Sequence, residues 1–315
     1  MGQKIVVLGT GGTIAGSAQS PSDNVAYRAG ERSVQSLLDT LALHAETRSA
    51  TWAAEQVAQI DSKDADFDLW SALHNRCSAH LADNTVIGIV ITHGTDTLEE
   101  TAWFLSQTLF TQKPVVLTCA MRPASALAPD GPQNLLDALA LAGRGEACGV
   151  SVVCAGTVHD PQHLRKVHPY RLDAFSSSEA GPMGWMEEGE LRLARDWNLL
   201  KRSSQLATFA LPQVWPWVEI VQSHAGANGK TVAALVAAGV NGLVVAATGN
   251  GTLHYALEGA LKCAAAQRIA VRVTSKCVVG AIVGQPEHGL PLACAGLSPE
   301  KARVSLMLEL LNHSA

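Results

Sequence analysis

Short apolar runs alternate with helix-like patterns along most of this chain, and this alternation limits its possible folds more than any other feature. The runs are rich in β-branched residues and lie at 5–8, 86–91, 115–117 and 150–153. Such runs are typical of strands that are covered on both faces. Between them, apolar residues recur at helical spacing, as at Val34, Leu37, Leu38 and Leu41. The repetition of strand, loop and helix predicts an α/β protein with a parallel sheet.

Two of the predicted helices carry start signals. Thr97-Leu-Glu-Glu100 predicts a capping box, in which the threonine hydroxyl binds a free backbone N–H of the first turn. Asp130-Gly-Pro132 predicts a capping carboxylate followed by an early proline.

The alternation also divides the chain. It fades from about residue 175 to 216, where Gly, Pro, Ser and Trp accumulate, and then resumes. The resumed pattern predicts strands at 218–221, 243–247 and 269–273, and helices at 231–238, at 254–266 and from Ser298 onward. We therefore predict a larger N-terminal parallel-sheet domain at residues 1–190, a linker at 191–215 and a smaller C-terminal α/β domain at 216–315.

Composition limits the partners and the location. The net charge of -5, without a run of like charges, argues against a nucleic-acid or anionic-membrane partner. Polar residues interrupt every apolar run well short of ~18 residues, so no membrane span is predicted. Met1 is followed at once by an apolar strand rather than by a secretory signal, which predicts a cytoplasmic protein. The seven cysteines contain no C-x-x-C pair, so we expect mostly buried thiols.

The first strand runs into Thr10-Gly-Gly-Thr-Ile-Ala-Gly16, which resembles a phosphate-binding loop at first sight. A dinucleotide fingerprint beginning at Gly9 would need a glycine at Ile14. A P-loop ending at Gly16 would need Lys and a hydroxyl residue at Ser17 and Ala18. Both phosphate interpretations therefore fail. The glycine-flanked Thr13 either bonds its own backbone in a tight turn or takes part in catalysis.

A second hydroxyl-rich loop, Thr92-His-Gly-Thr-Asp-Thr-Leu-Glu-Glu-Thr101, follows the run at 86–91. Its Asp96 is either a helix cap or an acid with a chemical role. The carboxyl ends of parallel strands share one edge of a sheet, where α/β proteins place their active sites. Two such loops on one sheet favour catalysis.

Three histidines, His159, His163 and His168, lie close together and could be read as metal ligands. Arg165 and Lys166 stand among them and would repel a cation. The H-E-x-x-H pattern is also missing, so we predict no metal site.

The two loops, Thr10–Gly16 and Ile91–Thr101, together resemble the two signature motifs of the bacterial-type L-asparaginase and glutaminase-asparaginase family. The similarity covers nearly the whole chain, because it continues through the segments Asp130-Gly-Pro-Gln-Asn134, Gly156-Thr-Val, Gly249-Asn-Gly251 and Ser-Pro-Glu-Lys-Ala-Arg303. The resemblance implies hydrolysis of the side-chain amide of asparagine without metal or cofactor. It also implies a homotetramer built as a dimer of dimers.

Matched position by position, the resemblance implies that Thr13 is the nucleophile and that Tyr27 closes over it from a mobile loop. It implies that Thr95, Asp96 and Lys166 form a second cluster of hydroxyl, acid and amine. A threonine hydroxyl needs a neighbouring base to take its proton, and a lysine beside an acid and hydroxyls can carry protons. Glycine-rich turns bring backbone N–H groups close enough to stabilise an oxyanion.

For substrate binding, the resemblance implies that Ser62 contacts the α-carboxylate and Asp96 the α-ammonium. Lys63 stands where relatives carry Gln or Glu, and Thr252 stands where some place Asn. Glu287 is the nearest match for an acid supplied by a neighbouring subunit. Because a lysine cannot accept a hydrogen bond from an ammonium, we expect strong preference for asparagine over the longer glutamine.

Two alternatives stay open at the sequence level. One is the asparaginase-like subunit of a tRNA-dependent amidotransferase, which needs a partner chain and an additional domain. The other is a catalytically silent module that binds an amino acid. The intact Thr13, Thr95, Asp96 and Lys166 argue against the silent module.

Overall fold

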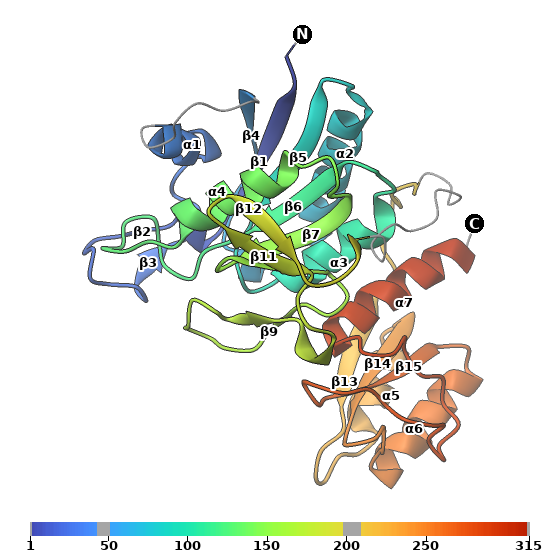
Figure 1. The fold of residues 1–315 in the computed structure, drawn as a ribbon. Helices are drawn as coiled ribbons and strands as arrows, with labels where there is room; N and C mark the ends of the chain where they lie inside the picture. Colours follow the sequence, from blue (N-terminus) through green and yellow to red (C-terminus); the bar gives the residue numbers. More distant parts are fainter. Residues whose placement is uncertain (1, 43–50, 198–208, 314–315) are drawn as a thin grey trace. The chain divides into compact units, whose positions relative to one another are not determined.

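The structure, a computed structural model, describes residues 2–42, 51–197 and 209–313 (Figure 1). The chain falls into two compact units, Met1–Phe209 and Ala210–Ala315, and each unit has its own sheet. Residues 198–208 of the predicted linker at 191–215 lie outside the described residues. The predicted domain limits 1–190 and 216–315 therefore stay predictions.

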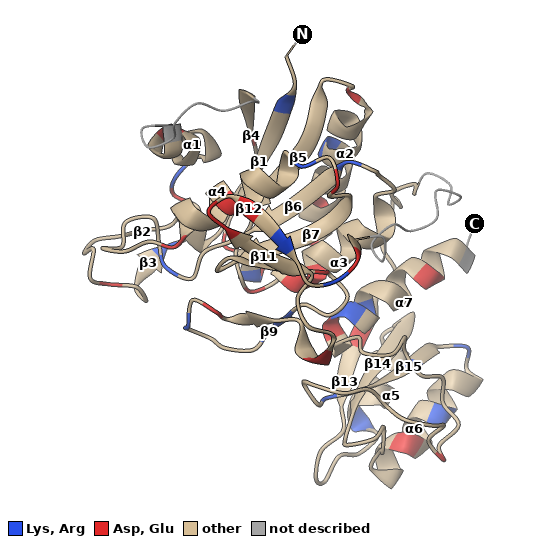
Figure 2. Cartoon of the chain, in the orientation of Figure 1, with Lys and Arg blue, Asp and Glu red and all other residues tan. Residues whose placement is uncertain are grey.

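The first unit is built on an eight-stranded sheet in the order β12-β11-β8-β7-β6-β5-β1-β4. The strands β4, β1, β5, β6 and β7 are parallel neighbours, which confirms the parallel sheet expected from the alternation. Their bounds are Lys4–Gly11 (β1), Thr51–Ile60 (β4), Val86–Thr92 (β5), Pro114–Thr118 (β6) and Gly149–Cys154 (β7). The central strands β5, β6 and β7 carry no charged residue, as their burial on both faces requires (Figure 2).

Four helices cover this sheet. They are α1 (Val34–Ala42), α2 (Phe67–Ala82), α3 (Leu98–Thr108) and α4 (Gly131–Ala142). Helix α1 packs on α4, and α2 packs on α3, so that each pair covers one face (Figure 1). The apolar stripe predicted for α1 is buried on the core, with Val34, Leu37, Leu38 and Leu41 at most 9% exposed. The helical periodicity was therefore a correct guide to the buried face.

Both helix-start predictions place a helix correctly. In both, however, the predicted capping side chain does not bond the first turn of its helix. Thr97 precedes α3, yet its hydroxyl donates to the carbonyl oxygen of Ser62 at 2.8 Å and makes no cap. Asp130 precedes α4, yet its carboxylate accepts from the backbone N–H groups of Met121 and Arg122, both at 2.9 Å. In each case a residue distant in sequence binds the side chain that local pattern had assigned to the helix.

An antiparallel extension of the sheet lies where the sequence showed no regular pattern. Strand β8 (Thr157–His159) turns back from β7, and β11 (Gly184–Glu187) pairs with β8 and with β12 (Glu190–Leu193). The two-residue turn between β11 and β12 has positive φ at Glu188 (51°) and Gly189 (77°). These angles are typical of the type I′ hairpin turn, for which the sequence Glu-Gly is a weak signal.

Four of the seven cysteines, Cys77, Cys119, Cys148 and Cys154, are buried free thiols, as expected for most of them. Burial raises the pKa of the Cys77 thiol to about 12. Cys119 and Cys154 stand at the neighbouring ends of β6 and β7, with sulfur atoms 3.0 Å apart.

The second unit has a three-stranded parallel sheet in the order β13-β14-β15. Its strands are β13 (Val218–Gln222), β14 (Gly242–Ala247) and β15 (Ala270–Ser275). Its helices are α5 (Lys230–Ala237), α6 (Tyr255–Ala266) and α7 (Pro299–His313). The resumed alternation thus predicted every one of these elements. Among the described residues of both units, no helix has the length and apolarity needed to cross a membrane.

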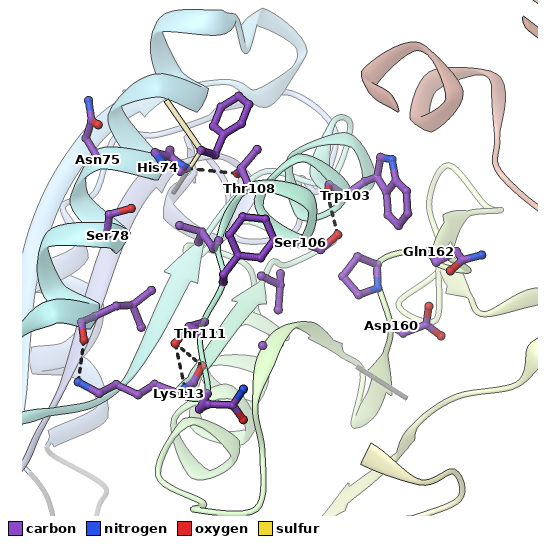
Figure 3. Close-up of a pocket in the computed structure, with 18 of the residues that line it drawn as sticks. His74, Asn75, Ser78, Trp103, Ser106, Thr108, Thr111, Lys113, Asp160 and Gln162 are labelled. Carbon is purple, nitrogen blue, oxygen red and sulfur yellow. Dashed lines mark hydrogen bonds between the residues drawn. The ribbon is translucent and has the colours of Figure 1, made fainter. Parts of the chain in front are cut away.

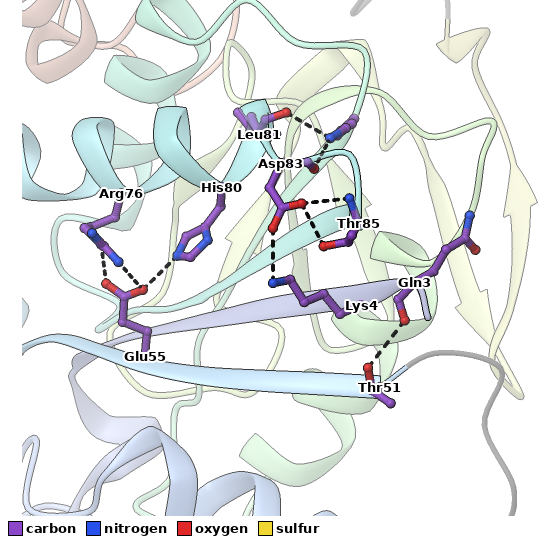
Figure 4. A network of polar contacts seen from close by, with 10 residues as sticks. Gln3, Lys4, Thr51, Glu55, Arg76, His80, Leu81, Asp83 and Thr85 are labelled. Atoms are coloured by element: carbon purple, nitrogen blue, oxygen red, sulfur yellow. Dashed lines mark hydrogen bonds and ion pairs between the residues drawn. The ribbon is translucent and has the colours of Figure 1, made fainter. Parts of the chain in front are cut away.

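A charged network ties the edge strand β4 of the first unit to α2 (Figure 4). The carboxylate of Glu55 accepts from Arg76 Nη2 and from His80 Nε2, each at 2.7 Å. Nearby, Lys4 Nζ lies 3.1 Å from Asp83. The hydrogen bond from Arg76 is the largest cause that holds the pKa of Glu55 below its ordinary value. Because the carboxylate has the lower pKa in the folded state, its contribution to stability is present at neutral pH and is lost as pH falls through that lowered pKa.

We predict that Glu55→Gln lowers the melting temperature at pH 7 by a few degrees, since a partly buried ion pair contributes about 1 kcal/mol. The difference from the unmodified protein should shrink as the pH falls below the ordinary glutamate pKa of about 4.3. Glu187→Gln is the matched control, because Glu187 pairs with Arg192 in an exposed position and should matter little. Differential scanning calorimetry at several pH values measures both. An equal loss in the two variants would contradict the prediction.

Candidate active site

Thr13 lies at the carboxyl end of β1, in the short helix η1 (Thr13–Ala15). The chain reaches it through Gly11 and Gly12, whose φ angles of 103° and 76° are readily adopted only by glycine. The Thr13 side chain is nearly buried, and its Oγ1 lies 2.6 Å from the phenolic oxygen of Tyr27. The hydroxyl therefore bonds another side chain, and the turn is not closed by a hydrogen bond from Thr13 to its own backbone.

Tyr27 stands on a small hairpin formed by β2 (Ser17–Ala18) and β3 (Tyr27–Arg28), in which it pairs with Ala18. Burial raises the pKa of the Tyr27 phenol, and the nearby carboxylates of Asp61 and Asp96 act in the same direction. The phenol is therefore protonated at neutral pH. It can give or take a hydrogen bond at Thr13, but it is not a phenolate base.

The second cluster forms at the carboxyl end of β5, where Thr95 is buried and Asp96 is half exposed. Lys166, on β9 (Arg165–Lys166), reaches both residues from a distant part of the chain. Its Nζ donates to Thr95 Oγ1 at 2.8 Å and to Asp96 Oδ1 at 2.6 Å. The structure thus brings together the hydroxyl, acid and amine that the sequence grouped. Asp96 binds the lysine through its carboxylate and is not a helix cap.

Ser62 lies in η2 (Ser62–Asp64), just after β4, and is buried. Its Oγ accepts from the backbone N–H of Asp96 at 3.1 Å. The neighbouring Lys63 is exposed, and its ammonium pairs with the carboxylate of Asp64. Lys63 is therefore turned to a neighbour on its own short helix, whereas Ser62 is joined to the loop that carries Thr95.

Three backbone loops meet closely at this site. A Cβ added to Gly12 would overlap Gly94 and would lie 2.9 Å from the carbonyl carbon of His93. A Cβ added to Gly94 would overlap the side chain of Ser62, whose own Cβ would be 2.7 Å away. Real Cβ atoms are not found at such distances from backbone atoms. Glycine at these two positions allows the loops of Thr13, Thr95 and Ser62 to pack against one another.

The Asp130–Asn134 motif proves to be structural support for the site. Asn134 Nδ2 donates to the carbonyl oxygen of Cys119 at 2.9 Å, and its Oδ1 accepts from the N–H of Ala155 at 3.0 Å. One side chain thereby joins the carboxyl ends of β6 and β7. The sequence alone gives Asn134 no role, because its two partners follow β6 and β7 and meet this helix residue only in the folded chain.

Thr252 and Glu287 belong to the second unit. Thr252 forms a bridge with Thr248 and donates its hydroxyl to the Thr248 carbonyl at 3.1 Å. The turn between them is held by Asn250, whose side chain bonds both the N–H and the carbonyl of Val283. Glu287 is exposed. The cluster of the first unit forms without either residue, and their predicted roles stay predictions.

The three histidines considered as metal ligands have other partners. His159 Nδ1 lies 2.7 Å from Ser177 Oγ, and burial lowers the pKa of His159 to about 4. His163 bonds the buried carboxylate of Asp160. His168 Nδ1 accepts from two backbone N–H groups of its own loop. Across the described residues, no group of three or more His, Cys, Asp or Glu side chains is arranged to hold a metal ion.

A separate cavity of about 1020 Å³ lies beside α2 and α3, and no predicted site residue lines it (Figure 3). Its Lys113 already donates to the carbonyl oxygens of Leu81 and Asp83. Its Arg195 is bound to Asp160 at 3.0 Å. The charged side chains Lys113 and Arg195 of this cavity are thus already paired, and the cavity lies apart from the cluster of Thr13, Thr95 and Lys166.

Comparison with known proteins covers both units. Residues 4–199 match the family model "Asparaginase, N-terminal", and residues 217–314 match "Glutaminase/Asparaginase C-terminal domain". The chain is 33% identical to L-asparaginase 2 of Bacillus subtilis over 312 residues, which covers 97% of this chain and 82% of that protein. It is 35% identical to L-asparaginase 2 of Escherichia coli over 313 residues, covering 97% and 88%. The crystal structure of a probable cytoplasmic L-asparaginase from Campylobacter jejuni superposes with a TM-score of 0.88 at 34% identity, covering 99% of this chain and 96% of that one.

We predict that Gly12→Ala destabilises the protein by about 1 to 3 kcal/mol, because the new methyl group must displace the Gly94 backbone at a φ that alanine adopts poorly. Chemical denaturation followed by circular dichroism measures this loss. Gly145→Ala is the control, since nothing lies within 4 Å of a Cβ there. Equal stability of the two variants would show that the loops do not need the close contact.

Proposed function

The chain belongs to the asparaginase family, and from this membership we propose that it hydrolyses the side-chain amide of L-asparagine to L-aspartate and ammonia. The observation that supports this most directly is the close packing of two hydroxyl-bearing loops. One loop offers Thr13 with Tyr27, and the other offers Thr95 with Lys166 and Asp96. Amide hydrolysis requires a nucleophile, a route for its proton and donors for the carbonyl oxygen.

In the proposed reaction, Thr13 Oγ1 attacks the carbon of the side-chain amide. The new C–O bond forms, the C–N bond breaks, and the proton that leaves the threonine hydroxyl departs on ammonia. Water then attacks the resulting ester, the bond to Thr13 breaks, and a proton returns to the threonine oxygen. The two steps together consume one water and release aspartate and ammonia.

The proton is proposed to move within the two clusters. Lys166 Nζ donates to the Thr95 hydroxyl at 2.8 Å, so a proton can be exchanged between these two groups. The Asp96 carboxylate lies 2.6 Å from the same Nζ and holds it in this position. Tyr27 is a protonated phenol, and its oxygen lies 2.6 Å from Thr13 Oγ1, where it orients the Thr13 hydroxyl. It can accept a proton from Thr13 only if it gives up its own phenolic proton in the same step.

The head group of the substrate is proposed to bind beside the same loops. Ser62 already accepts from Asp96 N–H, which leaves its own hydroxyl hydrogen to donate to the α-carboxylate. The Asp96 side chain is half exposed, and the carboxylate oxygen that does not bind Lys166 receives the α-ammonium. We further propose a cytoplasmic homotetramer, a dimer of dimers, in which Thr252 and Glu287 act from a neighbouring subunit.

Ammonia release from the purified protein tests the proposal. L-Asparagine should be hydrolysed well, L-glutamine weakly, and Thr13→Ala should lower turnover of asparagine by several powers of ten because the attacking oxygen is gone. Thr13→Ser retains a hydroxyl and is the matched control. Activity only with a charged tRNA and a second chain would favour the amidotransferase subunit. Binding of asparagine without ammonia would favour the silent module, and near-normal turnover by Thr13→Ala would exclude this nucleophile.

We predict that Lys63→Gln raises glutamine turnover relative to asparagine, because the amide supplies an acceptor for the α-ammonium of the longer substrate. A hydrogen bond to a charged group contributes about 1.5 kcal/mol, so the ratio of the two kcat/KM values should move by about tenfold. Lys63→Met, which removes the charge without adding an acceptor, should change the ratio less. If both variants keep the original ratio, Lys63 has no part in specificity.

A further inference from the structure

His93 directly precedes the loop that carries Thr95, and its side chain is completely buried. Its Nδ1 lies 2.8 Å from the carbonyl oxygen of Gly94, and its Nε2 lies 3.1 Å from Thr101 Oγ1 on α3. The same threonine oxygen accepts from the indole Nε1–H of Trp70 on α2 at 3.0 Å. The backbone N–H of His93 donates to the carbonyl oxygen of Thr118 on β6 at 2.9 Å.

The chemistry of these groups fixes the direction of every hydrogen bond in the series. An indole N–H only donates and a carbonyl oxygen only accepts. The Trp70 indole therefore donates to Thr101, and His93 Nδ1 must carry a hydrogen that it donates to Gly94. In the neutral ring, Nε2 is then the acceptor for the Thr101 hydroxyl. Burial lowers the pKa of His93, which favours this neutral form.

The bond to Gly94 sets the orientation of the next peptide group. No peptide bond among the described residues is cis, so the carbonyl of Gly94 and the N–H of Thr95 point in opposite directions. A peptide next to glycine rotates more freely than others because no Cβ restricts it. His93 removes that freedom by holding the Gly94 carbonyl on the buried side, toward α3. The Thr95 N–H is thereby directed away from the imidazole.

We propose that His93 is a positioning residue for the reaction described above: through the Gly94 carbonyl it holds the Gly94–Thr95 peptide so that the Thr95 N–H and hydroxyl face the substrate amide. This role rests on the proposed function. His93 touches neither substrate nor reacting atoms. It acts by keeping a donor group in place before charge develops on the amide oxygen, and such a fixed donor contributes mainly in the transition state.

Two amide variants separate this role from simple packing. His93→Asn places an N–H donor near the position of Nδ1, within reach of Gly94, whereas His93→Gln places its amide near the position of Nε2, within reach of Thr101. Both keep a polar side chain of similar character in the same buried site. Steady-state ammonia release gives kcat and KM for L-asparagine, and melting temperatures report the stability of each variant.

The role predicts that His93→Gln lowers kcat by about 10- to 100-fold with KM changed by less than about threefold. His93→Asn should recover most of that loss in kcat, even where the two variants have equal melting temperatures. Equal kcat values for the two variants, or a loss that follows melting temperature alone, would overturn the role of His93. An unmodified protein that releases no ammonia would overturn the proposed function and this role with it. An active unmodified protein with an unaffected His93→Gln variant would overturn the role alone.

Discussion

The backbone contact between Gly12 and Gly94 is the constraint on which the rest of the site depends. In the sheet, β1 lies between β4 and β5, so the loops that follow these three strands leave the same edge side by side. The missing side chain at Gly12 lets its loop reach the backbone of Gly94, and the missing side chain at Gly94 makes room for the side chain of Ser62. Thr13, Thr95 and Ser62 are then held by strand order, and no long flexible segment is needed to assemble them.

The sequence predicted the site residues correctly where strand order alone brings them together. Parallel strands end at one edge, so the sequence alone groups residues that follow different strands, such as Thr13 and Thr95. The same argument does not extend to Lys166. It lies beyond β8 on a short strand of its own, and only the family resemblance predicted its contact with Thr95 and Asp96. Repeating strands and helices were predicted in both units because their apolar periods are long and regular.

The sequence did not predict the hydrogen-bond partner of a polar side chain when both a local and a distant partner were possible. Thr97 and Asp130 have the local pattern of helix caps, but the carbonyl of Ser62 and the N–H groups of Met121 and Arg122 bind them instead. His93 belongs to the same class, since its ring contacts Thr101 on α3, which in turn accepts from Trp70 on α2, and these contacts form only after folding. The hairpin of β11 and β12 was missed for another reason: its strands have four residues each, too few to show a period.

The hairpin of β2 and β3 is joined by fewer contacts than the closely packed loops of Thr13, Thr95 and Ser62. Only two residue pairs join its strands, and its outer part is fastened to the loop after β6 by Ala18 N–H to Ser125 Oγ at 2.7 Å and by Leu127 N–H to the Pro21 carbonyl at 3.0 Å. Tyr27 is the part of the hairpin that touches Thr13. A substitution that removes either of these two bonds would loosen the hairpin and shift Tyr27 against Thr13, while Lys166 keeps its contacts with Thr95 and Asp96. For protein engineering, the hairpin is therefore a place to change the orientation of the Thr13 hydroxyl separately from the second cluster.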